Sequence, residues 1–150
     1  MKRRDVLAAA GTGLAMLALV RPAFATTEEM AAAINAFTGG AKPTEGKMTF
    51  DIAQLIDNGN AVPVTIAVDS PMSAADHVSA IAIFNERNPQ TDVAVFTLGP
   101  RAGKAQVSTR IRLATSQKLT AVARMSDGSY RSKSVSVIVA LAACIEGEAP

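Results

Sequence analysis

Short apolar runs separated by turn residues fill most of the second half of the chain. Val62, Val64, Ile66 and Val68 alternate with polar or small residues, which is the period-two pattern of a strand with one buried face. Similar runs predict six or seven strands, six of them over residues 61–68, 78–84, 93–98, 105–113, 118–125 and 130–141. Because no helical run of 10–15 residues separates them, the pattern favours an antiparallel β-sandwich over a parallel sheet.

A short helix is predicted before these strands. Thr26 and Glu29 have the spacing of a capping box, in which each side chain satisfies a backbone N–H at the start of a helix. The Ala-rich residues 29–37 then favour a helix that ends at Gly39-Gly40.

The first 25 residues have the pattern of a secretory signal. The basic residues Lys2–Arg4 precede an apolar run over residues 6–20, and Ala23-Phe24-Ala25 fits an A-x-A cleavage site. That run is shorter than the roughly 20 residues that cross a membrane. The paired arginines resemble the twin-arginine export signal, with Val6 where that signal usually has Phe; an ordinary secretory signal is the alternative. We expect a periplasmic protein with no membrane segment after cleavage.

The remaining segments are less regular. Residues 48–56 fit either a strand or a helical turn, and Asp57-Asn58-Gly59-Asn60 predicts a turn. Residues 142–150 lack a strand pattern and read as a short exposed tail. These patterns predict four parts: an export signal (1–25), an N-terminal helix and loop (26–46), a β-sandwich domain (47–141) and a C-terminal arm (142–150).

Composition narrows the classes of partner. The chain is 49% apolar but only 4% aromatic and has no tryptophan, so we expect a core of Val, Ile, Leu, Ala and Met whose β-branched share favours strands. The full chain has a formal charge of +2; residues 1–25 hold four basic residues and one acidic residue, so 11 basic and 12 acidic residues remain after cleavage, a net charge of −1. No basic face is implied, and we expect no nucleic acid partner.

Side chains for metal or acid–base chemistry are scarce. His77 is the only histidine, so a two-histidine metal site is impossible and a catalytic triad is not assured. We expect His77 on the surface, and no metal or other cofactor. Asp69 and Asp76 flank Ser70-Pro71-Met72 and are expected to shape a turn rather than to act as a catalytic pair. The sequence therefore favours a protein that is not an enzyme.

Cys144 is the remaining candidate for chemistry. It is the only cysteine, so it cannot close a disulfide within the chain, and a free thiol in an oxidising compartment invites unwanted disulfides. A lone cysteine beside an Ala-rich strand end is also commonly a small buried hydrophobic residue. Two interpretations stay open: a thiol presented on a C-terminal arm, and a packed thiol in a binding or assembly module. Reaction of the folded protein with a bulky thiol reagent distinguishes them.

The order and spacing of several short motifs resemble the SoxY family, the cargo-bearing subunit of the bacterial sulfur-oxidation carrier. The resemblance runs from about Asp57 to Cys144. Its motifs are Asn58-Gly59, Val62-Pro63-Val64, Asp69-Ser70-Pro71-Met72, Ile83-Phe84 with Asn88-Pro89, Thr109 to Ala114, Ala121-Val122-Ala123, Ser126-Asp127-Gly128, and a Val-rich strand before a single cysteine. Each motif is weak alone, and together they are specific.

This resemblance implies an immunoglobulin-like sandwich that forms a heterodimer with a second sandwich protein, SoxZ, supplied as a separate chain. It also implies a swinging arm whose cysteine receives thiosulfate-derived sulfur from a c-type cytochrome. Other periplasmic sulfur enzymes then process the cargo while the carrier holds it covalently. Carried over to this chain, Cys144 would be the attachment site, and no other residue inherits a chemical role.

The arm differs from the usual ending of the family, Gly-Gly-Cys-Gly-Gly. Here Ala142, Ala143, Ile145 and Glu146 surround Cys144, which is similar to a group of SoxY-related proteins with an Ala-Ala-Cys-Ile-Glu arm. These side chains make an arm stiffer and wider than glycines do, and three extended residues reach only roughly 10 Å beyond the last strand. We therefore expect partner enzymes with wider entrances, or a different sulfur cargo.

Overall fold

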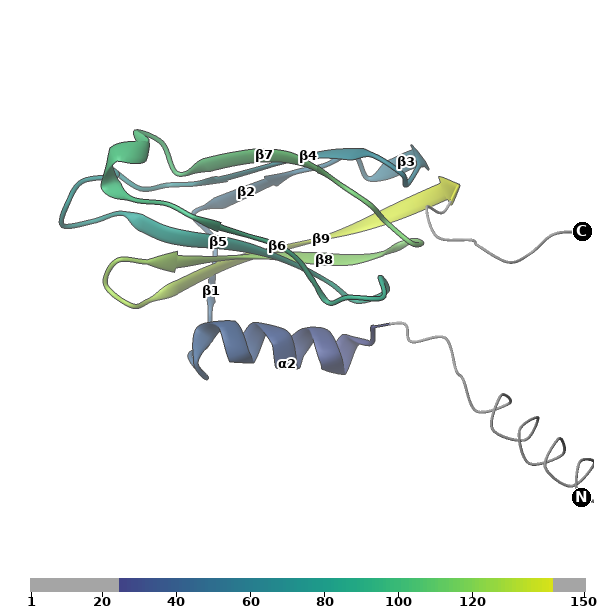
Figure 1. The fold of residues 1–150 in the computed structure, drawn as a ribbon, viewed down its shortest axis with the longest axis horizontal. Helices are drawn as coiled ribbons and strands as arrows, with labels where there is room; N and C mark the ends of the chain where they lie inside the picture. The colour runs from purple at the N-terminus through teal and green to yellow at the C-terminus, as the bar shows by residue number, and fades with distance from the viewer. Residues whose placement is uncertain (1–24, 142–150) are drawn as a thin grey trace, which may run out of the picture.

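The computed structural model describes residues 25–141, which form two packed β-sheets with one α-helix against the larger sheet (Figure 1). The predicted β-sandwich is confirmed. The larger sheet has the order β1 (Thr44–Glu45), β9 (Tyr130–Leu141), β8 (Gln117–Met125), β5 (Val78–Asn85) and β6 (Asp92–Thr97), and β3 (Leu55–Asn58) also pairs with β9. The smaller sheet has the order β2 (Met48–Asp51), β4 (Val62–Val68) and β7 (Gln106–Ile111). A short 3-10 helix, η1 (Pro100–Ala102), joins β6 to β7.

All six strands predicted from the apolar runs are present, as β4 to β9. The ambiguous residues 48–56 contain strand β2 and the start of strand β3 rather than a helical turn. Neighbouring long strands are antiparallel, for example β8 and β9, where Gln117 lies opposite Val137 and Arg124 lies opposite Tyr130.

Two short pairings are parallel, which the pattern did not predict. Thr44 in β1 lies opposite Arg131, and Leu55 in β3 lies opposite Ile138, both parallel to β9. Residues 44–58 thus start beside β9, cross to the smaller sheet as β2, and return to β9. Strands this short carry almost no periodicity, so their direction is not readable from the sequence. Their position covers two stretches of an edge of β9 that would otherwise be open.

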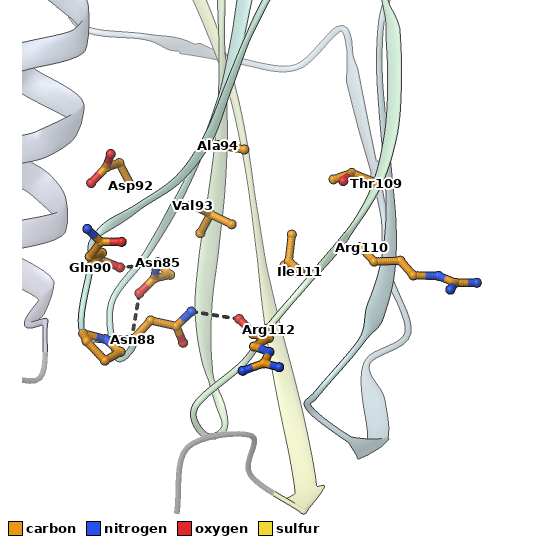
Figure 2. A pocket seen from close by; sticks show the side chains of 11 residues that line it. Asn85, Asn88, Gln90, Asp92, Val93, Ala94, Thr109, Arg110, Ile111 and Arg112 are labelled. Carbon is orange, nitrogen blue, oxygen red and sulfur yellow. Dashed lines mark hydrogen bonds between the residues drawn. The ribbon is translucent and has the colours of Figure 1, made fainter.

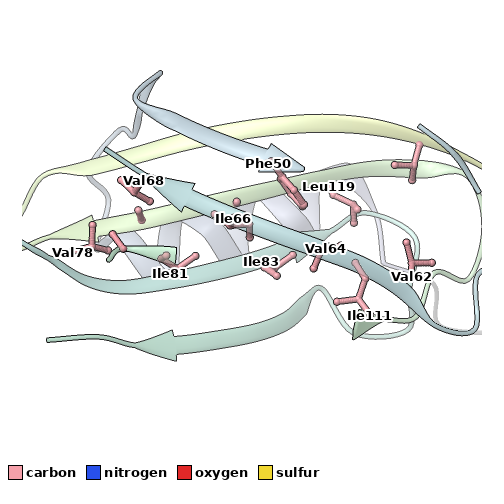
Figure 3. Close-up of a cluster of buried hydrophobic side chains, with 14 of the residues drawn as sticks. Phe50, Val62, Val64, Ile66, Val68, Val78, Ile81, Ile83, Ile111 and Leu119 are labelled. Carbon is pink, nitrogen blue, oxygen red and sulfur yellow. The ribbon is translucent and has the colours of Figure 1, made fainter. Parts of the chain in front are cut away.

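The main core lies between the two sheets (Figure 3). Ile66 from β4, Ile81 and Ile83 from β5, and Leu119 from β8 are fully buried there. In β4 the buried and more exposed residues alternate along the strand, as the period-two pattern predicts. The core is aliphatic apart from a few side chains such as Phe50.

Helix α2 (Thr27–Thr38) covers the outer face of the larger sheet (Figure 1). The predicted capping box is present: the Thr26 hydroxyl accepts the Glu29 N–H, and the Glu29 carboxylate accepts the Thr26 N–H. The helix ends at Gly39, whose φ of 62° lies in the left-handed region that glycine adopts most easily. The Phe37 ring lies edge-on to that of Phe84, with 5.8 Å between ring centroids.

Because of this helix, strand β5 is buried on both faces. Ile81 and Ile83 face the core between the sheets, and Ala82 and Phe84 face the helix. A strand covered on both sides reads as a near-continuous apolar run, which explains why residues 80–84 do not alternate. No helix within residues 25–141 is both long and apolar enough to cross a membrane.

Candidate functional site

The cysteine and its arm lie beyond the residues that the structure describes. The predictions that fall outside these residues are the attachment site Cys144, its neighbours Ala142, Ala143, Ile145 and Glu146, and the export signal up to residue 24. They stay predictions. The structure does describe the place where the arm begins, which is the end of β9 at Leu141.

The end of β9 is held by hydrogen bonds on both of its edges. The N–H of Gly59 donates to the carbonyl of Leu141 at 2.8 Å, and the Gly59 carbonyl accepts the N–H of Leu113 at 2.9 Å. On the other edge, the Val139 N–H donates to the hydroxyl of Ser116 at 2.8 Å. The turn predicted over residues 57–60 is shorter in the structure, because Asp57 and Asn58 belong to β3. Gly59 in this turn makes the contact that fixes the last described residue of β9.

A polar network centred on Asn88 holds the connection between β7 and β8 beside this strand end (Figure 2). The Asn88 amide nitrogen donates to the Arg112 carbonyl at 2.8 Å. The amide oxygen accepts the Ala114 N–H and the Gln117 side chain, both at 2.9 Å. The N–H of Asn88 donates to the side-chain oxygen of Asn85, which is fully buried. The backbone on both sides of Leu113 is thereby fixed.

A groove of about 470 Å³ lies between the β5–β6 turn, strand β6 and the end of β7. Strands β6 and β7 are the end strands of their sheets, so the groove marks the open side of the sandwich. Arg110 and Arg112 both border it and are both exposed. In Figure 2 the Arg110 side chain points away from the groove, whereas Arg112 lies at the end of β7, toward the end of the sandwich where β9 finishes.

Exposed apolar side chains gather at the same end. Of the four large hydrophobic residues that are exposed among the described residues, three lie on β3 or on the last four residues of β9: Leu55 (66% exposed), Ile138 (62%) and Leu141 (66%). Leu55 and Ile138 are directly paired across the two strands. The fourth, Val95, lies on β6. We call Leu55, Ile138 and Leu141 the apolar patch; such patches commonly mark protein contacts.

The remaining candidates from the sequence lie in a different place. His77 is half-buried at the start of β5, and its Nδ1 lies 3.1 Å from the Ser73 carbonyl oxygen. Asp69 and Asp76 border a polar hollow of about 280 Å³. The turn expected between them exists, but Ser73 makes it: its hydroxyl accepts the Asp76 N–H at 3.0 Å. The carboxylates were expected to shape this turn; a serine hydroxyl supplies that hydrogen bond.

The polar hollow is far from the start of the arm. Its lining includes Arg131 at the start of β9, and a strand from there to Leu141 spans roughly 33 Å. Asp127 in this hollow has its pKa lowered, mainly by the hydrogen bond that it accepts from the Ser129 hydroxyl. No group of three or more His, Cys, Asp or Glu side chains within residues 25–141 is placed to hold a metal ion.

Comparison with known proteins identifies the family. A family model described as "Sulfur oxidation protein SoxY" matches residues 34–144. Among solved structures, the sulfur carrier protein SoxY from Chlorobium limicola f thiosulfatophilum is similar, with 29% sequence identity and a TM-score of 0.64, over 76% of this chain and 98% of that chain. The search of curated proteins gives no match.

Superoxide reductases share the fold at lower sequence identity. The enzyme (neelaredoxin) from Ignicoccus hospitalis has 15% identity and a TM-score of 0.55, over 77% of this chain and 94% of that chain. The enzyme from Nanoarchaeum equitans has 14% identity and a TM-score of 0.53, over 63% of this chain and 98% of that chain. At these identities the likeness concerns the arrangement of strands alone.

Proposed function

The chain belongs to the SoxY family of sulfur oxidation proteins, and from this membership we propose that it is a sulfur carrier that holds its cargo covalently on Cys144. The family match extends to residue 144 itself. The main support for the proposal is that the residues matched by the family model include the lone cysteine. In this role the protein acts as a carrier for periplasmic enzymes and is not itself an enzyme.

The loading chemistry needs an electron acceptor. The Cys144 thiol and thiosulfate form a new S–S bond, giving a cysteine S-thiosulfonate; one proton and two electrons leave. The resemblance to SoxY implies that a c-type cytochrome accepts these two electrons. The thiolate is the reacting form of the cysteine, so access of an enzyme to an unburied thiol is essential.

The position of β9 supports an accessible thiol over a packed one. A buried cysteine would require the chain to continue against the core, but Ile138, Ala140 and Leu141 are already exposed. The strand is nevertheless firmly held up to Leu141 by the Gly59 and Ser116 contacts. This combination suits an arm that begins at a fixed point and extends away from the domain.

An intact mass spectrum of the mature protein from its native periplasm, before and after reduction, tests the carrier role. We expect a reducible sulfur-bearing adduct on Cys144 that is missing in Cys144→Ser, and its mass identifies the cargo. A thiol that is always unmodified, and inert to bulky alkylating reagents in the folded protein, would instead identify a β-sandwich binding module with a buried cysteine.

A SoxZ-like subunit is the partner proposed for a stable heterodimer, and the apolar patch is where we expect it to contact the chain. Leu55→Lys with Ile138→Lys should weaken copurification with that subunit by at least tenfold. The control is Val95→Lys, which adds one positive charge at a similarly exposed apolar residue, 56% exposed, on β6. Because the double variant adds two charges, this control is compared with Leu55→Lys and Ile138→Lys made singly. Equal loss with the control would remove the patch from the heterodimer interface.

The Ala-Ala-Cys-Ile-Glu arm makes a second part of the proposal testable. Because its side chains widen the arm, we propose that it serves dedicated partner enzymes or a different sulfur cargo. Mixed with thiosulfate-oxidising partners of a glycine-arm carrier, this chain should turn over more slowly than that carrier. Replacement of residues 142–146 by Gly-Gly-Cys-Gly-Gly should restore the rate. Equal rates before the replacement would contradict the idea.

A further inference from the structure

The bond predicted for removal of the export signal lies within the folded domain. Cleavage is expected after Ala25, yet Ala25 is only 4% exposed. Its N–H donates to the carbonyl of Asn88 at 3.0 Å, in the turn between β5 and β6. The residue that supplies the carbonyl of the bond to be cut is therefore packed against the sandwich, whereas a cleavage motif by itself predicts an accessible site.

The other side of the same bond is held by the capping box. The Thr26 N–H, which belongs to the bond itself, donates to the Glu29 carboxylate at 2.9 Å, and the Thr26 hydroxyl accepts the Glu29 N–H at 3.2 Å. One residue later, the Thr27 hydroxyl donates to the Glu86 carboxylate at 3.2 Å. Met30, which is 5% exposed, then packs the first turn of α2 against the larger sheet. Residues 25–30 are thus tied to the domain on both sides of the bond.

A peptidase needs the chain around its target bond as an extended strand in its own active site. That geometry is incompatible with a buried Ala25 and with a helix that begins at Thr27. Cleavage of a bond that is closed in the native state proceeds through a locally opened form, and its rate follows the population of that form. We propose that the folded domain controls removal of its own export signal: the peptidase cuts the Ala25–Thr26 bond only when residues 25–30 are released from the β5–β6 turn.

The cut is a hydrolysis, in which one water molecule adds across the Ala25–Thr26 amide. Ala25 keeps the carbonyl as a carboxylate and leaves with the signal, and Thr26 keeps the nitrogen as an α-ammonium. When α2 closes again, Asn88 lacks its N–H donor, but the Thr26 nitrogen faces Glu29 as before and now carries a charge. An ammonium–carboxylate hydrogen bond is stronger than the amide–carboxylate bond that it replaces, so the start of α2 re-forms once the signal has gone.

Glu29 and Glu28 provide a matched pair of variants. Glu29→Ala breaks the capping box, and Glu28→Ala removes the same charge one residue earlier, outside the capping box. Both residues lie in the first turn of α2, where their charges interact similarly with the helix dipole. Only Glu29→Ala frees the Thr26 N–H, and both variants keep Ala25 and Thr26 at the bond itself.

Purified bacterial signal peptidase in detergent micelles, acting on the full-length folded precursor, measures the rate of cleavage. A synthetic peptide of residues 11–35 carries the same bond without the domain, and circular dichroism in the same micelles checks that each precursor is folded. We expect the folded wild-type precursor to be cut at least about tenfold more slowly than the peptide, because several hydrogen bonds, each worth about a factor of five, break first. Glu29→Ala should speed cleavage of the folded precursor about fivefold, and Glu28→Ala less than about twofold. Neither change should alter cleavage of the corresponding peptide.

Three results would overturn the inference: a folded precursor that is cut as fast as the peptide, cleavage that is no faster in Glu29→Ala than in Glu28→Ala, or a product whose mass places its N-terminus at a residue other than Thr26. A peptide that is not cut would overturn it as well, because the bond would then be no substrate. All of these outcomes leave the sulfur-carrier proposal untouched, because Cys144 takes part in no step. The same rates are expected in a Cys144→Ser background.

Discussion

Replacement of Asn88 by alanine tests whether the polar network beside the end of β9 contributes to stability. The side chain makes three hydrogen bonds, to the backbone of Arg112 and Ala114 and to the Gln117 side chain. A hydrogen bond contributes about 1 kcal/mol net, and Asn88 is only half-buried, so water replaces part of what is lost. We expect the free energy of unfolding to fall by about 2–3 kcal/mol, which lowers the Tm by roughly 10 °C.

Urea unfolding of the reduced mature protein, followed by circular dichroism, measures this change. The dependence of the unfolding free energy on urea should be unaltered, so the shift of the midpoint reports stability directly. The matched control is Gln90→Ala in the same turn. Gln90 is exposed, and its side chain makes no hydrogen bond within residues 25–141, so its replacement should cost no more than about 0.5 kcal/mol.

An isosteric variant separates the donor from the acceptor. Asn88→Asp keeps an oxygen for Ala114 and Gln117 but replaces the donor to the Arg112 carbonyl with a second oxygen. Its stability should lie between those of the wild type and Asn88→Ala at neutral pH. Equal midpoints for Asn88→Ala and Gln90→Ala would refute the reasoning, because the network would then have no more effect than an exposed side chain.

Three further predictions concern single contacts. Ser116→Ala leaves the Val139 N–H without its acceptor, so this amide should exchange hydrogen faster by an amount equivalent to about 1 kcal/mol, with exchange in α2 unchanged. Phe37→Ala removes the aromatic contact between α2 and the sheet and should lower the urea midpoint by an amount equivalent to about 2 kcal/mol; no shift would mean that the helix docks without it. Ser129→Ala should raise the pKa of Asp127 in an NMR titration, because the Ser129 hydroxyl is the main cause of its lowering. Because the pKa of Asp127 is lower in the folded protein, its carboxylate stabilises the fold at pH values above its unfolded pKa, and this stabilisation is lost as the pH falls through the folded pKa. If the free energy of unfolding of Ser129→Ala changes with acid pH in the same way as that of the wild type, the Ser129 hydroxyl does not lower this pKa.

The parts of the fold that the sequence predicts best are those with local causes. The alternation from Val62 to Val68 is enough for β4, and Thr26 with Glu29 is enough for the start of α2. The apolar run over residues 80–84 of β5 fits a strand covered on both faces, but nothing in that run indicates that a helix forms the second cover.

Long-range contacts could not be predicted in this way. Residues 85–89 read as an ordinary turn, yet Asn85 is fully buried and Asn88 bonds to residues that lie 24 to 29 positions later. The sequence around an asparagine that only forms a turn and around one that also bonds to distant residues can look the same, because the distant hydrogen-bond partners are what distinguish them. Cys144, in contrast, is singled out by the sequence because it is the only cysteine and follows the last predicted strand. Its proposed role rests on the family and is tested by the experiments proposed above.

The pairing of β3 with the end of β9 has a mechanical consequence. A load applied beyond Leu141 pulls along the axis of β9, and the hydrogen bonds to β3 and β8 lie across that axis. Such a load shears several bonds at once instead of opening them one after another. The hydrogen bonds from Gly59 to Leu141 and from Val139 to Ser116 lie nearest the pulled end and bear this load first. The domain should therefore yield to pulling at its C-terminal end only at forces well above those that unzip a hairpin from its open end.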